Sequence, residues 1–305
     1  MNYKRLVPIL LILGALAMGT TLAAHIHKFN MTSSKDNDMQ STSTLIRLGE
    51  PQGSDLNGTG TSVDQQFGAI FYQREWPTEN PGTVEYEQGE HSFTVPNVMS
   101  TMGFADKDVP GGIYNWDISF GVSAEQADAH QFARDRMMAF LASLRAAGWK
   151  RFIQTHRPRL TGKQAWFYAA SDGVNGMYSL DSTYTPTMDE WMKAKGNFPK
   201  WDFYADGVYL EISFMESNMG GFVGKGTYLL DATIKNEYAF YGLGYFPGDA
   251  EKIKNWKALI PAELKKYHAM RLKTEADLKA HGFTIDTTYQ DPPINALAAS
   301  GGTAR

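Results

Sequence analysis

Apolar and polar residues alternate along several short segments of the chain, which is the pattern of half-buried β-strands. The clearest case is segment 113–122, where every second residue from Tyr114 to Phe120 is aromatic or aliphatic. Segment 91–95 alternates in the same way and stops at Pro96, and 68–72 is a short apolar run. A second group of strands is predicted at residues 165–170, 177–184, 203–215 and 226–241.

After Ser123 the spacing of the apolar residues changes from that of a strand to that of a helix. Apolar side chains recur at helical spacing from Ala133 to Leu144. Ser123 suits the N-cap, with Gln126 as its capping-box partner, and Gly148 suits the left-handed residue that ends a helix. The helices predicted from such patterns span residues 124–147, 187–195 and 261–280.

The order of these elements indicates the fold class. The strands outnumber the helices and occur in runs, which favours an α+β fold with a mainly antiparallel sheet and two principal helices. Residues 144–153 and 278–285 each combine a helix end, a glycine, an aromatic residue and a strand-like run. Two related strand–helix–strand halves would explain this similarity. Ordinary turn chemistry at two helix ends would explain it too, and we favour that interpretation.

Composition divides the chain into segments. Of the 37 residues in 30–66, 22 are Ser, Thr, Gly, Asn or Asp and none is aromatic, so this stretch cannot bury enough apolar area to offset its ordering entropy. Its apolar island, Leu45–Leu48, suits a short strand. We predict a flexible tether at 24–66, an α+β region at 67–291 with one domain or two subdomains split near 160–200, and a disordered tail at 292–305.

The N-terminus has the order of a secretory signal peptide. Lys4 and Arg5 precede an apolar run from Leu6 to Ala17, and small residues follow up to Ala24. We predict a signal peptide at 1–23 and a periplasmic or otherwise exported protein. The alternative is an uncleaved anchor in the inner membrane with the body facing the periplasm, because the apolar stretch approaches the roughly 20 residues that span a bilayer.

Composition also excludes several classes of protein. The chain has no cysteine, which rules out disulfide scaffolds, zinc–thiolate sites, iron–sulfur clusters and cysteine nucleophiles. Its formal net charge of −4 argues against nucleic-acid binding. Without Lys4 and Arg5 the mature chain carries 27 basic and 33 acidic residues, a net charge of −6.

Motifs of familiar enzymes are absent: the chain has no nucleophile elbow, no HExxH sequence and no Walker P-loop. Glycine-rich residues 220–226 lie between two strand patterns, which predicts a hairpin loop, with a mobile contact loop as the alternative.

Residues 106–117 resemble a calcium loop only in part, because Pro110 replaces an oxygen ligand. No histidine pair has ligand spacing. We predict no catalytic residue, no cofactor and no metal.

Carboxylates crowd the second strand group, at Asp202, Asp206, Glu211, Glu216 and Asp231. A glycosidase needs two carboxylates about 5 to 10 Å apart, so a hydrolase with a carboxylate-based site stays open. We interpret Asp202 and Asp206 as residues of the turn before a strand.

Aromatic residues are concentrated between Trp201 and Phe246. Most such side chains fill cores, but Tyr, Trp and Phe also anchor protein partners. The segment after Phe240 is rich in glycine and suits an exposed loop. The candidate partner-binding residues are Phe222, Tyr241, Tyr245 and Phe246.

Together these features predict an exported, non-enzymatic envelope protein that binds and inhibits a protein partner. A signal peptide, an α+β body and the lack of a catalytic signature resemble, in general layout, the periplasmic immunity proteins of bacterial toxin systems. The alternatives are an envelope glycan-binding protein and a hydrolase with a carboxylate-based site. We expect a protein partner first and a glycan second, no nucleic acid, and membrane contact only through the N-terminal segment.

Overall fold

The computed structural model describes residues 43–49, 61–66, 68–171, 174, 178–194, 199–218 and 220–298, all within one compact unit that spans residues 40–305. The predicted signal peptide at 1–23 and the first part of the predicted tether lie outside the described residues. Within the described residues, no helix is long and apolar enough to cross a membrane.

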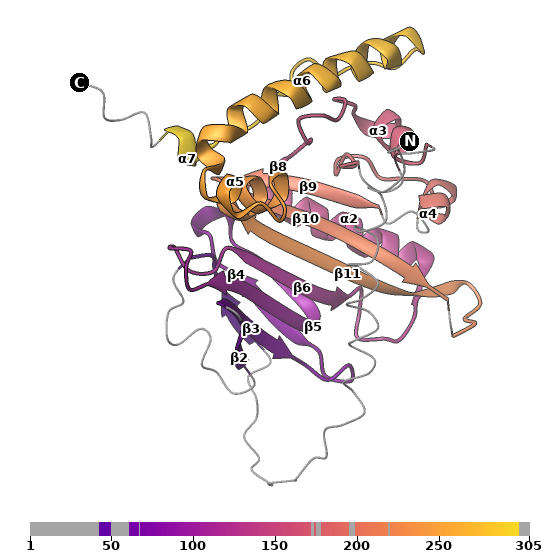
Figure 1. Ribbon diagram of the computed structural model, residues 1–305. Helices are drawn as coiled ribbons and strands as arrows, with labels where there is room; N and C mark the ends of the chain where they lie inside the picture. The colour runs from indigo at the N-terminus through magenta and orange to yellow at the C-terminus, as the bar shows by residue number, and fades with distance from the viewer. Residues whose placement is uncertain are drawn as a thin grey trace, which may run out of the picture. The chain divides into compact units, whose positions relative to one another are not determined.

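One large sheet dominates the described part of the chain (Figure 1). Its strands follow the order β1-β4-β5-β6-β11-β10-β9-β8, with β3 and β2 continuing from β5 and with β7 on β11. Every strand pair is antiparallel except β1 with β4. The strands are β1 Ser43–Ile46, β2 Thr61–Gln66, β3 Ala69–Glu75, β4 Gly82–Tyr86, β5 Phe93–Asp106, β6 Asn115–Gly121, β7 Asp128–Ala129, β8 Lys150–Arg151, β9 Lys200–Ala205, β10 Val208–Ser217 and β11 Lys225–Asn236.

Helices lie on both faces and at one edge of this sheet. The two longest are α2 and α6, so the predicted α+β fold with a mainly antiparallel sheet and two principal helices is confirmed. The helical elements are the 3-10 turn η1 Gly89–His91, α2 His130–Ala146, α3 Gly162–Ala169, α4 Met188–Ala194, the π-helical η2 Tyr238–Leu243, α5 Ala250–Lys254, α6 Trp256–Ala280 and α7 Asn295–Ala298.

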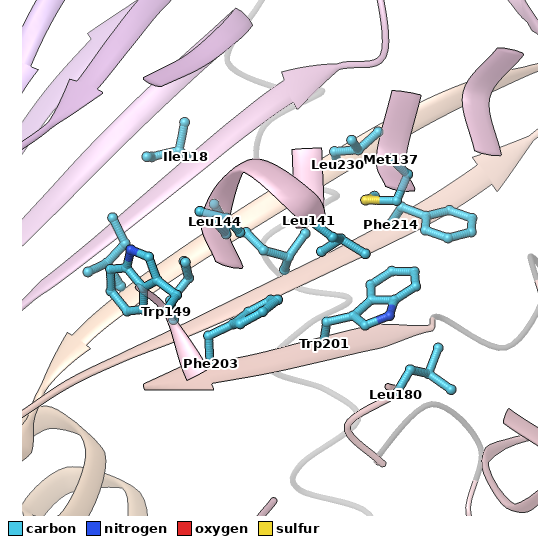
Figure 2. Close-up of a cluster of buried hydrophobic side chains, with 14 of the residues drawn as sticks. Ile118, Met137, Leu141, Leu144, Trp149, Leu180, Trp201, Phe203, Phe214 and Leu230 are labelled. Carbon is cyan, nitrogen blue, oxygen red and sulfur yellow. The ribbon is translucent and has the colours of Figure 1, made fainter. Parts of the chain in front are cut away.

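The main core forms where α2 covers the apolar face of β6, β11, β10 and β9. Successive side chains of a strand point to opposite faces, so the apolar positions of these strands gather on one side. Met137, Leu141 and Leu144 of α2 are at most 2% exposed and lie against that face (Figure 2). The sheet contributes Trp116, Ile118, Phe120, Trp201, Phe203, Leu210, Ile212, Phe214, Leu230, Ala232 and Ile234.

A second, smaller core lies on the opposite face. Tyr204 of β9 and Tyr209 of β10 pack there with Trp256 and Ile260 at the start of α6 and with aromatic residues of η2. Trp256 and Tyr241 stack with their ring planes only 8° apart. This cluster fixes the first turns of α6 over one end of the sheet.

Farther along, α6 is held by polar contacts and by Leu278, which packs in the main core. Arg271 is 1% exposed; its guanidinium donates to the carbonyl oxygens of residues 153, 154 and 157 and forms an ion pair with Asp291. Glu275, also buried, receives two side-chain hydrogen bonds from Arg159. Buried charges are tolerated only when they are paired and hydrogen-bonded, and both conditions hold here.

Several predicted elements are corrected by the structure. The helix predicted over 124–147 begins at His130, because the Ser123 hydroxyl accepts the Glu125 N–H and donates to Asp128 in a local turn. The strand predicted at 165–170 is helix α3, and among the described residues 178–184 of the strand predicted at 177–184 only Ser179 makes an isolated bridge. The helix predicted at 187–195 is confirmed as α4.

The similarity between 144–153 and 278–285 is limited to the turn that ends each helix, where the N–H of Trp149 donates to the Leu144 carbonyl and that of Phe283 donates to the Leu278 carbonyl. Gly148 and Gly282 have φ angles of 83° and 86°, which glycine adopts without strain. A strand, β8, follows the first glycine, but residues 283–294 contain no strand. The idea of two related strand–helix–strand halves is therefore wrong.

The folded region is longer at both ends than predicted. Strands β1 and β2 lie within the range predicted as a tether, and Ile46 of the apolar island is 2% exposed beside β4. In the range predicted as a disordered tail, the N–H groups of Asn295 and Ala296 donate to the buried carboxylate of Glu237. Backbone pairing holds β1 and β2. Apolar packing on the second core helps to hold the C-terminal segment, through Ile294, Ala296 and Leu297.

The substitution Leu141→Ala should lower the free energy of unfolding by about 2–5 kcal/mol, because it opens a cavity under a side chain that is 0% exposed. Phe132→Ala, on the same helix but 44% exposed, should change it by less than about 0.5 kcal/mol. Urea-induced unfolding of both variants measures the difference, and equal effects would contradict this account of the core.

Candidate functional site

The face of the sheet opposite α2 carries a row of carboxylates. Glu211 of β10 lies opposite Asp202 of β9 on one side and Thr233 of β11 on the other, and Thr233 lies opposite Asp117 of β6. Asp231 is diagonal to this row. The interpretation of Asp202 as a turn residue is therefore wrong, because it lies inside β9.

Lys200 forms ion pairs with both carboxylates at one end of the row. Its Nζ lies 3.1 Å from Asp202 Oδ1 and 2.7 Å from Glu211 Oε2. Burial raises the pKa of Asp202 to about 6, although the charge of Lys200 opposes this shift. Burial also opposes ionisation of Glu211, but Lys200 attracts its charge and holds its pKa below the usual range. Asp202 is therefore the carboxyl group that retains its proton more easily, and Glu211 is the one that ionises more easily.

Asp231 is a further perturbed carboxyl on this face. Burial raises its pKa, a hydrogen bond of 2.6 Å from the Ser119 hydroxyl opposes the shift, and the charges of Asp117 and Glu211 add to it. No group of three or more potential metal ligands occurs among the described residues.

This arrangement is an ion-pair network rather than an open acid–base pair. A glycosidase leaves about 5 to 10 Å between its two carboxyl groups for the sugar and water. Here the ammonium of Lys200 bridges both carboxylates, and Asp202 is only 6% exposed. The geometry therefore does not favour the carboxylate-based hydrolase.

The structure separates the four residues predicted to bind a partner. Tyr241 and Phe246 are 3% and 7% exposed and belong to the second core, because the segment predicted as a loop forms the π-helical η2. The Tyr241 hydroxyl is hydrogen-bonded to that of Tyr209 at 2.8 Å. These two residues cannot anchor a partner. Tyr245 lies half-buried at the wall of a cavity, and Phe222 lies on a different element.

Phe222 belongs to the hairpin that joins β10 to β11. The pairs Glu216–Tyr228 and Ser217–Thr227 extend this hairpin beyond the first residue of β9 and the last residue of β6. The short strand β7 pairs with β11 at Lys225 and Gly226, and the end of the hairpin projects past it (Figure 1). The glycine-rich segment is thus confirmed as a hairpin loop. We call Asn218 and residues 220–224 the hairpin tip.

The hairpin tip is held in one conformation by its own contacts. The Asn218 side chain accepts the Phe222 N–H at 2.8 Å and donates to the Phe222 carbonyl at 3.2 Å. The Phe222 ring lies so close to Gly220 that an added Cβ would approach it to 2.2 Å. Val223 follows and is 98% exposed. The tip therefore presents an apolar side chain on an ordered turn.

A groove of about 670 Å³ lies beside the strands that carry the hairpin tip. It is bordered by β11 at residues 227–229, by residues 121–128 and by the loop before β4. Its lining includes Glu79, Glu125 and Asp128, and contains no lysine or arginine. Burial raises the pKa of Asp128, and the hydrogen bond from Ser123 opposes that shift. We call this feature the acidic groove.

Sequence reasoning found Phe222 but missed most of these features. The alternation in Lys200–Ala205 could have indicated the carboxylate row, because it places Lys200, Asp202 and Tyr204 on the same face of the strand. The acidic groove has no comparable signal, because its carboxylates come from separate segments.

Comparison of the chain with protein-family models, with curated proteins and with solved structures gave no match. The assignment of function therefore rests on the geometry of these surfaces.

The substitution Asp202→Asn should alter the pH dependence of stability. In the unfolded chain an aspartate titrates near pH 3.9, whereas burial raises the pKa of Asp202 to about 6 in the folded protein. Between these values only the unfolded chain releases this proton, so the wild type loses stability as the pH rises. Asparagine mimics the protonated form, so the variant should gain about 1–3 kcal/mol relative to wild type from pH 4 to pH 7.

Urea-induced unfolding at several pH values measures this difference. Asp206→Asn is the matched control, because its side chain is 83% exposed. Curves that stay parallel for Asp202→Asn and wild type would show that burial does not raise this pKa.

Proposed function

We propose that the protein is an exported, non-enzymatic binding protein that recognises a protein partner through the hairpin tip. The observation that carries this proposal is Val223, which is 98% exposed at the end of a projecting and internally braced hairpin. Binding residues are disproportionately found on loops that a rigid scaffold positions, and the sheet positions this hairpin.

The order of the hairpin tip favours binding over a structural role. A flexible loop loses conformational entropy when it binds, and a preorganised loop loses less. The Asn218 bonds and the packing of Phe222 on Gly220 fix the tip before any partner arrives. Within the described chain, these contacts join residues of the hairpin tip to one another and not to the rest of the fold. We therefore infer that they preserve the shape of the tip for binding.

Charge indicates the chemistry of the partner. The acidic groove lies beside β11, and its lining carries three carboxylates without a basic residue. A partner with an apolar pocket for Val223 and basic side chains for the acidic groove would complement both features.

The N-terminal sequence supports a place in the envelope. A signal peptide at 1–23 would release the protein into the periplasm, and an uncleaved segment would hold it at the inner membrane. The layout of leader, α+β body and no catalytic motif supports an immunity-type role, in which a projecting hairpin fills a cleft of a toxin and blocks it.

The substitution Val223→Asp should weaken partner binding at least about tenfold, because it places a charge in an apolar contact. Val63→Asp is the matched control, since Val63 is 50% exposed on β2. Affinity capture from envelope extract with all three proteins identifies candidates, and titration calorimetry with the purified partner gives the affinities.

A protein captured by wild type and Val63→Asp, but not by Val223→Asp, would support the proposal. Equal capture by all three proteins, or none by any, would refute the hairpin tip as the binding surface.

Replacing Glu79 and Glu125 together by glutamine should slow association with that partner several-fold at low salt and flatten its salt dependence, because electrostatic steering is lost. Glu251→Gln combined with Glu263→Gln removes the same charge elsewhere on the surface. Stopped-flow association rates distinguish the two pairs, and identical rates would exclude the acidic groove from the encounter.

A further inference from the structure

A cavity of about 450 Å³ lies at the end of β11 that is remote from the hairpin tip. Its walls come from Lys235 of β11, from η2, from the middle of α6 and from Gln154 and His156 after β8. Ten residues of extended strand, about 33 Å, separate Lys235 from Lys225 beside the tip. The cavity is therefore distinct from the proposed protein-binding surface.

Four aromatic rings, those of His156, Phe240, Tyr245 and Tyr267, line this cavity and pack against one another. Tyr245 contacts Tyr267 of α6 edge-to-face at 5.4 Å and lies 6.3 Å from Phe240. Phe240 is itself stacked on Tyr209 at 3.9 Å, and His156 lies 5.5 Å from Tyr267. A flat ring entering the cavity would meet these side chains without reordering them.

One cation of the cavity is available to a ligand. Lys235 forms no ion pair within the part of the chain that the structure describes, although its charge attracts Glu211 at a distance. The neighbouring cations Arg271 and Lys200 are paired with their own carboxylates. Burial first, and then the charges of basic neighbours, lower the pKa of His156 to about 4, so its imidazole is neutral at pH 7.

The remaining polar groups suit a ligand with hydrogen-bonding groups around a ring. The Gln154 amide and the His156 ring supply both donors and acceptors at the wall. Met270, 52% exposed on α6, adds an adaptable apolar surface. The volume is within the range of sites that hold small organic molecules.

We propose that this cavity binds a small ring compound that bears a carboxylate, with the ring between Phe240, Tyr245 and Tyr267 and the carboxylate on Lys235. Acidic sugars and aromatic acids share this chemistry. The proposal does not depend on the hairpin tip, and either can fail without the other.

Ligand titrations of the full mature chain test the proposal. The probes are N-acetylmuramic acid and phenylacetate, each with a neutral counterpart, N-acetylglucosamine and phenylacetamide. Saturable binding of at least one acid is expected at millimolar concentration, about tenfold tighter than its neutral counterpart. The acid that binds shows whether the ligand is a sugar or an aromatic compound.

Substitutions of residues that line the cavity test whether the acid binds there. Lys235→Gln should weaken binding of that acid about tenfold. Lys225→Gln, on the same strand beside the hairpin, should not. Tyr267→Leu should also weaken binding, and circular dichroism checks that each variant is folded. Absence of binding by both acids, equal affinity for acid and neutral compound, or unchanged affinity in Lys235→Gln would each overturn the proposal.

Discussion

The alternation of side chains along β6, β11, β10 and β9 determines most of this structure. Because neighbouring residues of a strand point to opposite faces, one face of these strands is apolar and the other is polar. The apolar face requires a cover, which α2 supplies with Leu141 and its neighbours. The opposite face carries two different features: the carboxylate row, whose buried charges are paired with Lys200, and the second aromatic core, which η2 and the start of α6 cover.

The polar face also explains how α6 is attached. α6 finds apolar partners at its two ends, where Trp256 packs in the second core and Leu278 packs in the main core. Between these ends, Arg271 and Glu275 replace apolar packing with hydrogen bonds to loop carbonyls and to opposite charges. The cavity beside Lys235 lies between β11 and α6. Tyr267, which lines it, is located on α6 between Trp256 and Arg271, the residues that attach the helix.

The sequence predicts the elements whose pattern is local. The alternation around Trp116, the short helix α4 and the glycine-rich hairpin all follow from neighbouring residues, and the α+β class follows from their order. The failures have tertiary causes. Residues 165–170 form a helix because its buried face, which includes Trp166, packs into the main core. Tyr241 is buried because η2 turns it toward Trp256, and Phe246 joins the same core just after η2. These contacts between separate segments are not revealed by any local pattern.

The positions of the hairpin tip and the aromatic cavity at opposite ends of β11 limit how the two can communicate. A ligand alters partner affinity only if it binds two conformations of the protein differently. The strand between the sites is hydrogen-bonded on both sides, to β6 and β10, so it offers little freedom to shift along its length. The structure therefore favours two sites that bind independently of each other.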